Sequence, residues 1–576
     1  MTMPDENLLS RFGLSRIADV PPVDTGVVLS SPSDPIGEAA RFVASKDLTS
    51  EAVIVVGFGD GHHALEIARK IGKKKPILLV EAIPGVFRRA MSIVDISPLL
   101  RSGARFHLGD DAGKFSGVLN AFIEETSVDS ISVIVHPPSL RTHEFHRRAI
   151  DEIKHAINRR QVGVVTLIRH ARLLETNAFR NVGYFIGAHG VDEFAGAFRG
   201  RPVIVVAAGP SLSEAIPSLQ KIVGRIPIVA VGKACKLLRS RGIAPDFVVA
   251  LDMLPESAAC MEATDGIPLV FDIDCCHEVV AAHGGGLITG TSNTPLAIWA
   301  EGFCAAKKGI LAKGQSVAHT AFSFAVMLGA SPIVLVGVDL SFPGSKTHAE
   351  GTAYTWGGDV DKMSGLVDVA SVSGGTVKSL KSFQSFISTF EDEISRSGVA
   401  VYNASPGGAL IRGAMSIDLA DWCDGLLPTQ AGDIRPVIDG IMATPVAFNL
   451  PLLFSKIARI KEEASAALAL CERGLGWAKR LSYLDPANKA DVVFRRKIDI
   501  NINDARKQIM QSNPVRVFRR LLAETEFRMK ENLAKMNKFY AAGNRADGLK
   551  VRDANVALFF SGVKNAMGQV LEIMKR

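Results

Sequence analysis

The stretch RPVIVVAAGPSLSEAIPSLQKI, residues 201–222, decides the class of fold. Its β-branched run predicts a buried strand, AAGPSL predicts a tight turn, and the remainder has helical spacing. A strand that passes through such a turn into a helix is the repeating unit of a parallel sheet. We therefore predict an α/β protein whose central domain is an open sheet flanked by helices.

The same alternation continues along the chain. Residues 226–252, IPIVAVGKACKLLRSRGIAPDFVVALD, predict strand, helix and strand. Further short β-branched runs occur in IPLVFDID, GGGLITGTS, KKGILAKG and SPIVLVGVDLSF. Between the last two, VAHTAFSFAVMLG predicts a buried helix. These runs supply the other strands of one open sheet.

An earlier part of the chain shows the same alternation of strand and helix patterns. EAVIVVGFGDG (51–61), HHALEIARKIGKK and PILLVEA predict a βαβ unit, and HPPSL (136–140) predicts a loop at the sheet edge. Gly57, Gly59 and Gly61 lie at the strand-to-helix turn, and Glu81 ends the next strand. This is the layout of a nucleotide-binding turn whose acid binds ribose hydroxyls. The G-x-G-x-G spacing departs from the dinucleotide fingerprint, and such a turn can also simply close a corner.

The last part of the chain has almost no strand signal. Apolar residues from Ile457 to Ala478 recur at three- and four-residue steps, which is typical of a helical bundle. We therefore predict a Rossmann-like domain at 1–174, a catalytic domain at 175–428, a linker at 429–449 and a helical domain at 450–576.

Composition and charge narrow the function classes. The seven cysteines have no CxxC spacing, and no apolar stretch approaches the roughly 20 residues of a membrane span. We expect a cytoplasmic protein. Residues 450–576 carry 25 Lys and Arg against 13 Asp and Glu, whereas the rest of the chain is slightly acidic. That excess favours an acidic partner there, whether a protein, a nucleic acid or a membrane surface, and a solvated helix surface is the alternative. Of these partners we expect a protein and no nucleic acid.

AAGPSL (207–212) marks the place where we expect chemistry. Gly209 permits close backbone approach, Pro210 fixes the turn, and Ser211 stands at an expected helix N-cap. Amides and a hydroxyl there would point at an anionic group, at the strand ends where open α/β sheets bind ligands. Later strand ends and loops would contribute further ligand-binding residues, namely Lys233, Asp252, Ser292, Asn293, Ser316 and Asp339.

An ordered series of motifs resembles a known family. It comprises GPSL, GKACKLL with GIAPDFVVALD, LVGVDLSF followed by THAEG, and NASPGGALIRG (403–413). Over about residues 175–425 the chain resembles the motility accessory factors, bacterial flagellin glycosyltransferases whose central domain is similar to bacterial sialyltransferases. The resemblance implies a CMP-activated nonulosonic acid donor, of the pseudaminic or legionaminic type, and Ser or Thr acceptors on flagellin. It implies a role in flagellum assembly and no required cofactor.

The resemblance also implies roles for single residues. Gly209, Pro210 and Ser211 match the nucleotide-binding turn of the sialyltransferases, and Lys233 and Asp252 match the motility-factor pattern. His348 follows the VGVDLSF strand, roughly where the sialyltransferases carry their base. The donor already has a phosphate leaving group, so the reaction needs one proton acceptor for the acceptor hydroxyl. His319, in a predicted buried helix, is expected to be a core residue.

Three alternatives remain open at this stage. FDID (271–274) is a D-x-D pattern that could hold a divalent metal, although a monophosphate donor has less need of one and we expect no metal site. A pterin diphosphokinase, which would use ATP, has a similar GPSL-containing core, but the chain has no Walker-A motif. A non-catalytic flagellin-binding scaffold would keep the fold without turnover.

Overall fold

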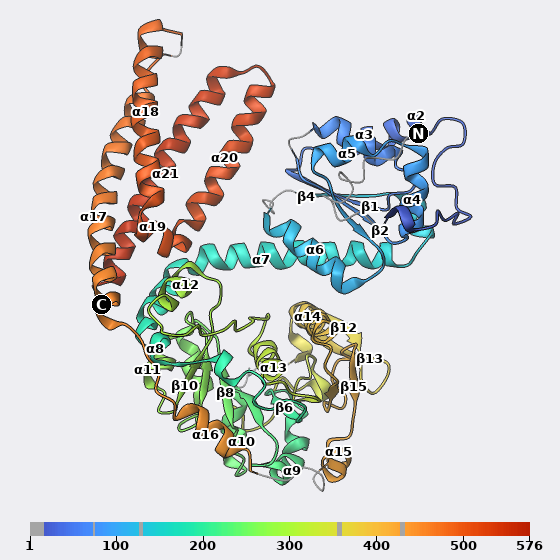
Figure 1. Cartoon of the computed structure of the whole chain (residues 1–576), viewed down its shortest axis with the longest axis vertical. Helices are drawn as coiled ribbons and strands as arrows, with labels where there is room; N and C mark the ends of the chain where they lie inside the picture. The colour runs from blue at the N-terminus through green and yellow to red at the C-terminus, as the bar shows by residue number, and fades with distance from the viewer. Residues whose placement is uncertain are drawn as a thin grey trace. The chain divides into compact units, whose positions relative to one another are not determined.

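The computed structural model describes residues 17–72, 75–125, 131–353, 360–426, 433–485 and 487–575 (Figure 1). Its contacts divide the chain into two compact units, Met1–Thr166 and Leu167–Arg576. The division falls within the long helix α7, Phe145–Arg180. The finer domain bounds expected from the sequence stay predictions.

The first unit contains a four-stranded parallel sheet in the order β3-β2-β1-β4. The predicted βαβ unit is confirmed, because β1 and β2 are parallel neighbours, with Val53 paired to Ile77, and helix α3 connects them. Both strands are buried along their whole length, which explains their uninterrupted apolar sequences. The strands and α-helices before α7 are α2 (Pro35–Ala44), β1 (Ala52–Val56), α3 (His62–Ile71), β2 (Ile77–Glu81), α4 (Pro84–Ile93), α5 (Ser97–Ser102), β3 (Arg105–Leu108), α6 (Ala112–Glu125) and β4 (Ile131–Val135).

The second unit is built on a nine-stranded parallel sheet in the order β15-β14-β11-β6-β7-β8-β9-β10-β5. The predicted α/β class is thereby confirmed. Its strands are β5 (His189–Gly190), β6 (Val203–Val206), β7 (Ile228–Val231), β8 (Phe247–Ala250), β9 (Leu269–Phe271), β10 (Leu287–Thr289), β11 (Ile333–Val336), β14 (Val401–Asn403) and β15 (Ala414–Ser416).

The strand order reverses at β6. From β6 the chain builds outward through β7 and β8 on one side, and then returns to place β11 on the other side. The loops that leave β6 and β11 therefore diverge and open a crevice at the carboxyl ends of the strands, where sheets of this kind bind ligands. The predicted buried helix is confirmed as α13, Val317–Met327, which packs on β6 and β7.

The carboxyl-terminal part of the second unit is helical, as expected. It contains α17 (Leu450–Leu481), α18 (Lys489–Gln511), α19 (Asn513–Val517), α20 (Ala523–Ala541) and α21 (Arg545–Ile573). Its apolar core is continuous with buried residues of α8 (Val182–Gly187) and α12 (Pro295–Glu301) in the sheet part. Helix α21 packs against both α17 and α20. Within the described residues, no helix combines the length and the apolar character needed to cross a membrane.

Some local expectations need correction. KKGILAKG is not a strand, because only Ile310 forms an isolated bridge there, with Thr291. The structure adds an unpredicted antiparallel pair, β12 (Leu366–Ala370) and β13 (Thr376–Leu380), followed by helix α14 (Lys381–Ser397). Helix α16, Arg435–Met442, lies in the expected linker, and its Ile438 is buried in the core of the sheet.

Candidate functional site

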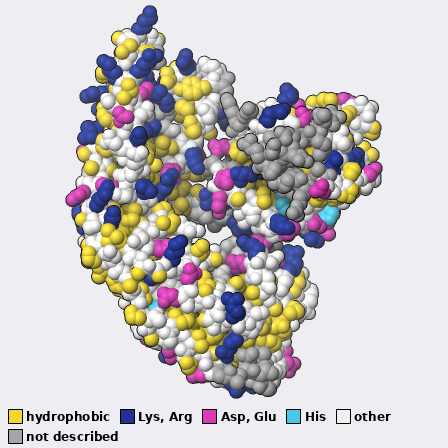
Figure 2. All heavy atoms as spheres, in the orientation of Figure 1, with side chains coloured by type: hydrophobic (Ala, Val, Ile, Leu, Met, Phe, Trp, Pro, Cys, Tyr) yellow, Lys and Arg dark blue, Asp and Glu magenta, His cyan; other side chains and the backbone are white. Residues whose placement is uncertain are grey.

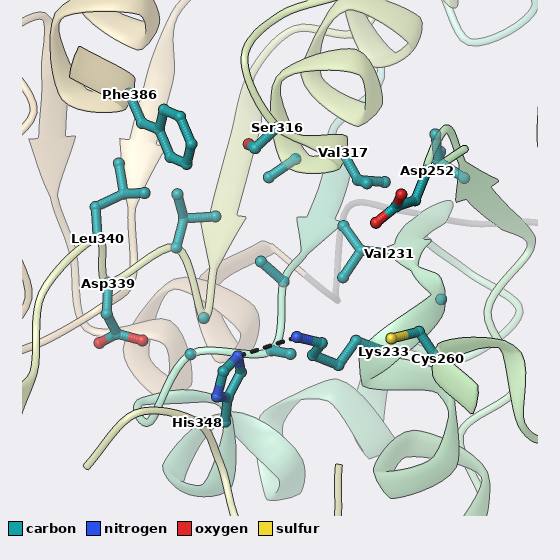
Figure 3. A pocket seen from close by; sticks show the side chains of 18 of the residues that line it. Val231, Lys233, Asp252, Cys260, Ser316, Val317, Asp339, Leu340, His348 and Phe386 are labelled. Carbon is teal, nitrogen blue, oxygen red and sulfur yellow. Dashed lines mark hydrogen bonds between the residues drawn. The ribbon is translucent and has the colours of Figure 1, made fainter. Parts of the chain in front are cut away.

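A cavity of about 300 Å³ lies at the reversal point of the large sheet. The carboxyl ends of β6, β7, β8 and β11 supply its floor, and the loop after β11 and helix α14 supply its walls. Figure 3 shows that its polar side chains come from several of these elements and point into one space. It brings together seven of the ten predicted site residues, Gly209, Pro210, Lys233, Asp252, Ser316, Asp339 and His348.

The AAGPSL turn packs tightly against the end of β11. The Gly209 amide donates to the Gly337 carbonyl at 2.9 Å, and a Cβ at residue 209 would lie 2.1 Å from Asp339 Oδ2. Only glycine therefore fits at this position without displacing Asp339. The close approach confirms the reason for which glycine was expected in this turn.

Ser211 is hydrogen-bonded to Asp339. Its amide and its hydroxyl both donate to Asp339 Oδ2, at 3.2 and 2.9 Å. The hydroxyl is therefore engaged by the Asp339 carboxylate, Ser211 does not line the cavity, and its part in donor binding stays a prediction. Ser211 itself is buried beneath the cavity.

Asp339 is the buried acid of the cavity. Burial raises the pKa of its carboxyl to about 6, and its Oδ1 has no hydrogen-bond partner among the described residues. A carboxylate in this position needs a partner that donates a hydrogen bond. Asp339 therefore suits a hydroxyl or amino group of a ligand better than a phosphate.

Lys233 and His348 form the cationic side of the cavity. Lys233 is the second residue of helix α10, Gly232–Ser240, and its Nζ lies 3.4 Å from His348 Nε2 (Figure 3). Burial and the charge of Lys233 lower the pKa of His348 to about 4, so the imidazole is neutral at pH 7. A lysine beside a helix N-terminus suits a phosphate, and a neutral imidazole suits proton acceptance.

The other predicted residues of the cavity stand around this pair. Asp252 follows β8, and its Oδ1 accepts from the Leu254 amide at 3.0 Å. Cys260 lines the cavity on the same side, where burial raises the pKa of its thiol. Ser316 precedes α13, and its Oγ lies 2.7 Å from His319 Nδ1.

His319 is a core residue, as predicted. It is fully buried, its Nε2 lies 3.0 Å from the Phe386 carbonyl, and its ring stacks on Phe390. Its partners belong to α14, which also supplies Phe383 and Phe386 to the cavity wall. Sequence reasoning missed these aromatic residues, because the helical spacing of α14 does not indicate which face meets the cavity.

Two predicted residues lie elsewhere. Ser292 and Asn293 follow β10 and do not belong to the cavity lining. Asn293 has a positive φ of 53°, a conformation that asparagine tolerates in turns. Their part in donor binding stays a prediction without support from the geometry of the cavity.

The D-x-D acids are occupied by protein cations. Lys313 Nζ lies 2.5 Å from Asp272 and 3.0 Å from Asp274, and Arg520 lies 2.8 Å from Asp274. Neither acid lines the cavity. The part of the chain that the structure describes holds no group of three or more His, Cys, Asp or Glu arranged to bind a metal.

The glycine turn of the first unit is also filled by the protein. Glu81 is buried, and its carboxylate accepts from the amides of Phe58 and Ile83. A Cβ at Gly57 or Gly59 would collide with Ser139 or His136 of the HPPSL loop. These contacts engage both carboxylate oxygens of Glu81, and they favour the interpretation of this turn as a packed corner.

Comparison with known structures identifies the architecture. The chain matches the structure of MAf glycosyltransferase from Magnetospirillum magneticum AMB-1 over 99% of its own length and 88% of that protein, with a TM-score of 0.55 and 15% identity. This chain has the MAf glycosyltransferase fold. The resemblance to the motility accessory factors, which rested on motifs in the central part, is confirmed by a fold match that includes both flanking parts.

A second comparison covers the sheet of this MAf glycosyltransferase fold. Residues 176–345 match the family described as 6-hydroxymethylpterin diphosphokinase MptE-like. The matched segment contains the glycine turn, Lys233, Asp252 and Asp339, but it ends before His348. The family match therefore covers most of the cavity floor and not the predicted base.

A curated relative adds a short match. An uncharacterized protein of Treponema pallidum (strain Nichols) is 49% identical over 45 residues, which is 8% of this chain. The chain spans only 12% of that relative's length. This similarity is local and carries no functional argument.

Proposed function

We propose that this protein is a glycosyltransferase that transfers a nonulosonic acid of the pseudaminic or legionaminic type from a CMP-activated donor to Ser or Thr of flagellin. Such a modification would serve flagellum assembly and motility. The MAf glycosyltransferase fold and the ordered motifs of the central part support this proposal.

One observation carries the proposal furthest: Lys233 and His348 meet in the cavity at 3.4 Å. A glycosyl transfer from a phosphate-linked donor needs a cation for the departing phosphate and a base for the acceptor hydroxyl. Lys233 supplies the cation, and the neutral imidazole of His348 can accept the proton. Asp339, which also lines the cavity, can bind a donor hydroxyl or amino group through Oδ1.

The proposed reaction does not require a divalent metal. A cytidine monophosphate donor has no diphosphate for a metal to bridge, and Lys233 already supplies positive charge where the phosphate leaves. The two acids of the D-x-D pattern are engaged by Lys313 and Arg520. We therefore expect transfer to survive chelation of divalent metals.

Nucleotide preference tests the donor assignment. We expect CMP to bind about tenfold or more tightly than ATP, a difference of ~1.4 kcal/mol or more in isothermal titration calorimetry. Gly209→Ala should lose this binding, because the added Cβ would meet Asp339 Oδ2. Gly425→Ala is the matched control, because a Cβ there would meet no atom within 4 Å.

A specific observation keeps a second candidate function in view. The match of residues 176–345 to the pterin diphosphokinase MptE-like family favours ATP as the nucleotide. Preference for ATP over CMP in the same titration would replace our proposal with that activity. Binding of neither nucleotide would favour a flagellin-binding scaffold without turnover.

The helical part is the surface that we propose for flagellin. Three large apolar side chains of α18 are exposed, Val493 at 56%, Phe494 at 45% and Ile500 at 60%, beside exposed Arg496 and Lys497. Figure 2 shows Lys and Arg interspersed with apolar side chains over the region of α17 and α18. A mixed apolar and basic helix face suits an amphipathic helix with acidic neighbours.

Charge reversal on α18 tests this surface without removing the domain. We expect Arg496→Glu combined with Lys497→Glu to slow flagellin association about tenfold at low salt, because charges at an interface rim act mainly on the encounter rate. Surface plasmon resonance with immobilised flagellin measures this rate. The control reverses Arg239 and Arg241, two exposed residues near the end of α10. Equal rates for both double variants would contradict the assignment of the surface.

Deletion of residues 450–576 is a poor substitute for that experiment. The apolar core of the helices continues into α8 and α12, so deletion would expose Phe185, Ile186 and Leu296. It would also remove Arg520, which pairs with buried Glu175 and Asp274. Loss of flagellin capture after such a deletion would not separate docking from folding.

A further inference from the structure

The contact between Lys233 and His348 is held by backbone hydrogen bonds on both sides. The Ala349 amide donates to the Ala208 carbonyl at 3.1 Å, which fixes the His348 loop on the glycine turn. The Ala353 amide donates to the carbonyl of Lys233 at 3.1 Å. Two segments 115 residues apart are thus joined so that the ammonium faces the imidazole (Figure 3).

The contact with Lys233 makes the imidazole of His348 a weaker base. An ammonium has only hydrogens to offer, so the Nε2 atom of His348 must accept and its lone pair is in use. The proton of the neutral ring is then on Nδ1, which is buried and has no hydrogen-bond partner among the described residues. Burial and the Lys233 charge keep the pKa of His348 near 4, too low for an efficient base at pH 7.

We infer that the phosphate of the donor releases the base: Lys233 turns from His348 to the phosphate when the donor enters the cavity, and Nε2 becomes available to the acceptor hydroxyl. This inference rests on the proposed function, and it adds that the donor must bind before the acceptor hydroxyl can react. A hydroxyl that arrives before the donor meets a base whose lone pair is occupied. Lys233 thereby acts as a positioning residue for His348 as well as a partner of the leaving group.

The transfer step balances with these two residues. The acceptor oxygen forms a bond to the anomeric carbon, and the bond from that carbon to the phosphate oxygen breaks. The electron pair of the broken bond leaves on the phosphate of CMP, which gains a negative charge beside the Lys233 ammonium. The hydroxyl proton moves to Nε2 of His348 and later passes to solvent. The reaction needs no oxidant, reductant or further reactant.

Other ionisable groups around the cavity must be kept constant in a test. Asp252 and Cys260 lie on the Lys233 side, and Asp339 lines the cavity on the end of β11. Glu350 is exposed two residues after His348. A variant of Lys233 keeps all four side chains in place. Burial raises the pKa of the Cys260 thiol and the Lys233 charge lowers it, so the thiol stays neutral when Lys233 is replaced. A change in the titration of His348 then reports the loss of the ammonium.

Histidine NMR on the full-length protein tests the inference. We expect the His348 signal, assigned by its absence in His348→Ala, to titrate near pH 4 in the wild-type protein. In Lys233→Met it should titrate about one pH unit higher or more, because the neighbouring positive charge is gone. Lys236→Met is the matched control, since Lys236 lies on the same helix but pairs with Glu262 on the surface.

A comparison of CMP with cytidine isolates the effect of the phosphate on the titration of His348. CMP should raise the pH at which wild-type His348 titrates, whereas cytidine, which has no phosphate, should not. An unchanged His348 titration in Lys233→Met, or bound CMP without any rise, would overturn the release of the base and leave the proposed transferase intact. Failure of CMP to bind at all in calorimetry would instead refute the donor assignment, and the inference would fall with it.

Discussion

Flagellin coexpressed with the His348→Ala variant and a nonulosonate pathway should remain unmodified or nearly so. Removal of a general base typically lowers the rate about 10²–10⁴-fold. Among the described residues, the side chain of His348 has one polar contact, with Lys233 Nζ, and its Nδ1 has no hydrogen-bond partner. Affinity for CMP should therefore stay close to that of the wild-type protein. Intact-mass spectrometry of flagellin measures the transfer, and calorimetry measures the binding.

The matched control is Glu350→Gln, in the same loop. Glu350 is exposed and does not line the cavity, so we expect a normal transfer rate. If His348→Ala glycosylates flagellin at the normal rate while Glu350→Gln does not, the base is Glu350. Loss of both CMP binding and transfer in His348→Ala would assign His348 to donor binding and not to proton transfer.

The strand runs explain why the fold was predictable. VIVV of β6 and IVLV of β11 are buried on both faces of a parallel sheet, so their sequences are continuous apolar runs rich in β-branched residues. The glycine turn after β6 could also be predicted, because the Asp339 carboxylate and the Gly337 carbonyl lie so close to residue 209 that they leave no room for a side chain there. Strand-end reasoning then placed most predicted site residues in one cavity.

The strand order also explains why Ser292 and Asn293 lie outside the cavity. Strand ends of a parallel sheet share an edge, but that edge is long. β10 stands four strands from β6, about 19 Å away at ~4.8 Å per strand. A residue can therefore obey the strand-end rule and still lie outside the crevice, whose position depends on the order of strands. That order is not readable from the spacing of motifs.

Contacts between side chains far apart in the sequence could not be predicted from the motifs. Ser211 and Asp339 are 128 residues apart, and no local pattern indicates that the hydroxyl is used by the acid. The D-x-D acids are a stronger case, because Arg520 comes from the helical part of the chain, nearly 250 residues beyond Asp274. A motif predicts which groups a segment offers, and only the tertiary contacts decide which partner takes them.

Replacement of Arg520 should cause the largest loss of stability. The guanidinium is almost fully buried, and it binds Glu175 of α7 at 3.0 Å and Asp274 at 2.8 Å. Removing one partner from a buried ion pair costs about 3–5 kcal/mol, because the remaining charge loses its compensation. Arg520→Met keeps much of the side-chain volume, so urea unfolding of this variant at pH 7 should report mainly the lost charge.

The pH dependence of this loss follows from the two carboxyls. Burial raises the pKa of Glu175 above its ordinary value, against the opposing effect of Arg520. Burial also acts to raise the pKa of Asp274, but Lys313 and Arg520 hold it below the ordinary value. Without Arg520 both folded-state pKa values should rise, so the folded state binds protons more readily than the unfolded state. The destabilisation should then be greatest at neutral pH and should shrink toward pH 5.

Arg519→Met provides the control for this experiment. Arg519 is adjacent in sequence, but its side chain is 55% exposed and pairs with Glu526 at the surface. Its replacement should change the free energy of unfolding by less than about 1 kcal/mol, as is usual for an exposed ion pair. If Arg520→Met unfolds at the same urea concentration as Arg519→Met, or if its deficit does not diminish at pH 5, the buried pairs with Glu175 and Asp274 do not hold the helical part on the sheet.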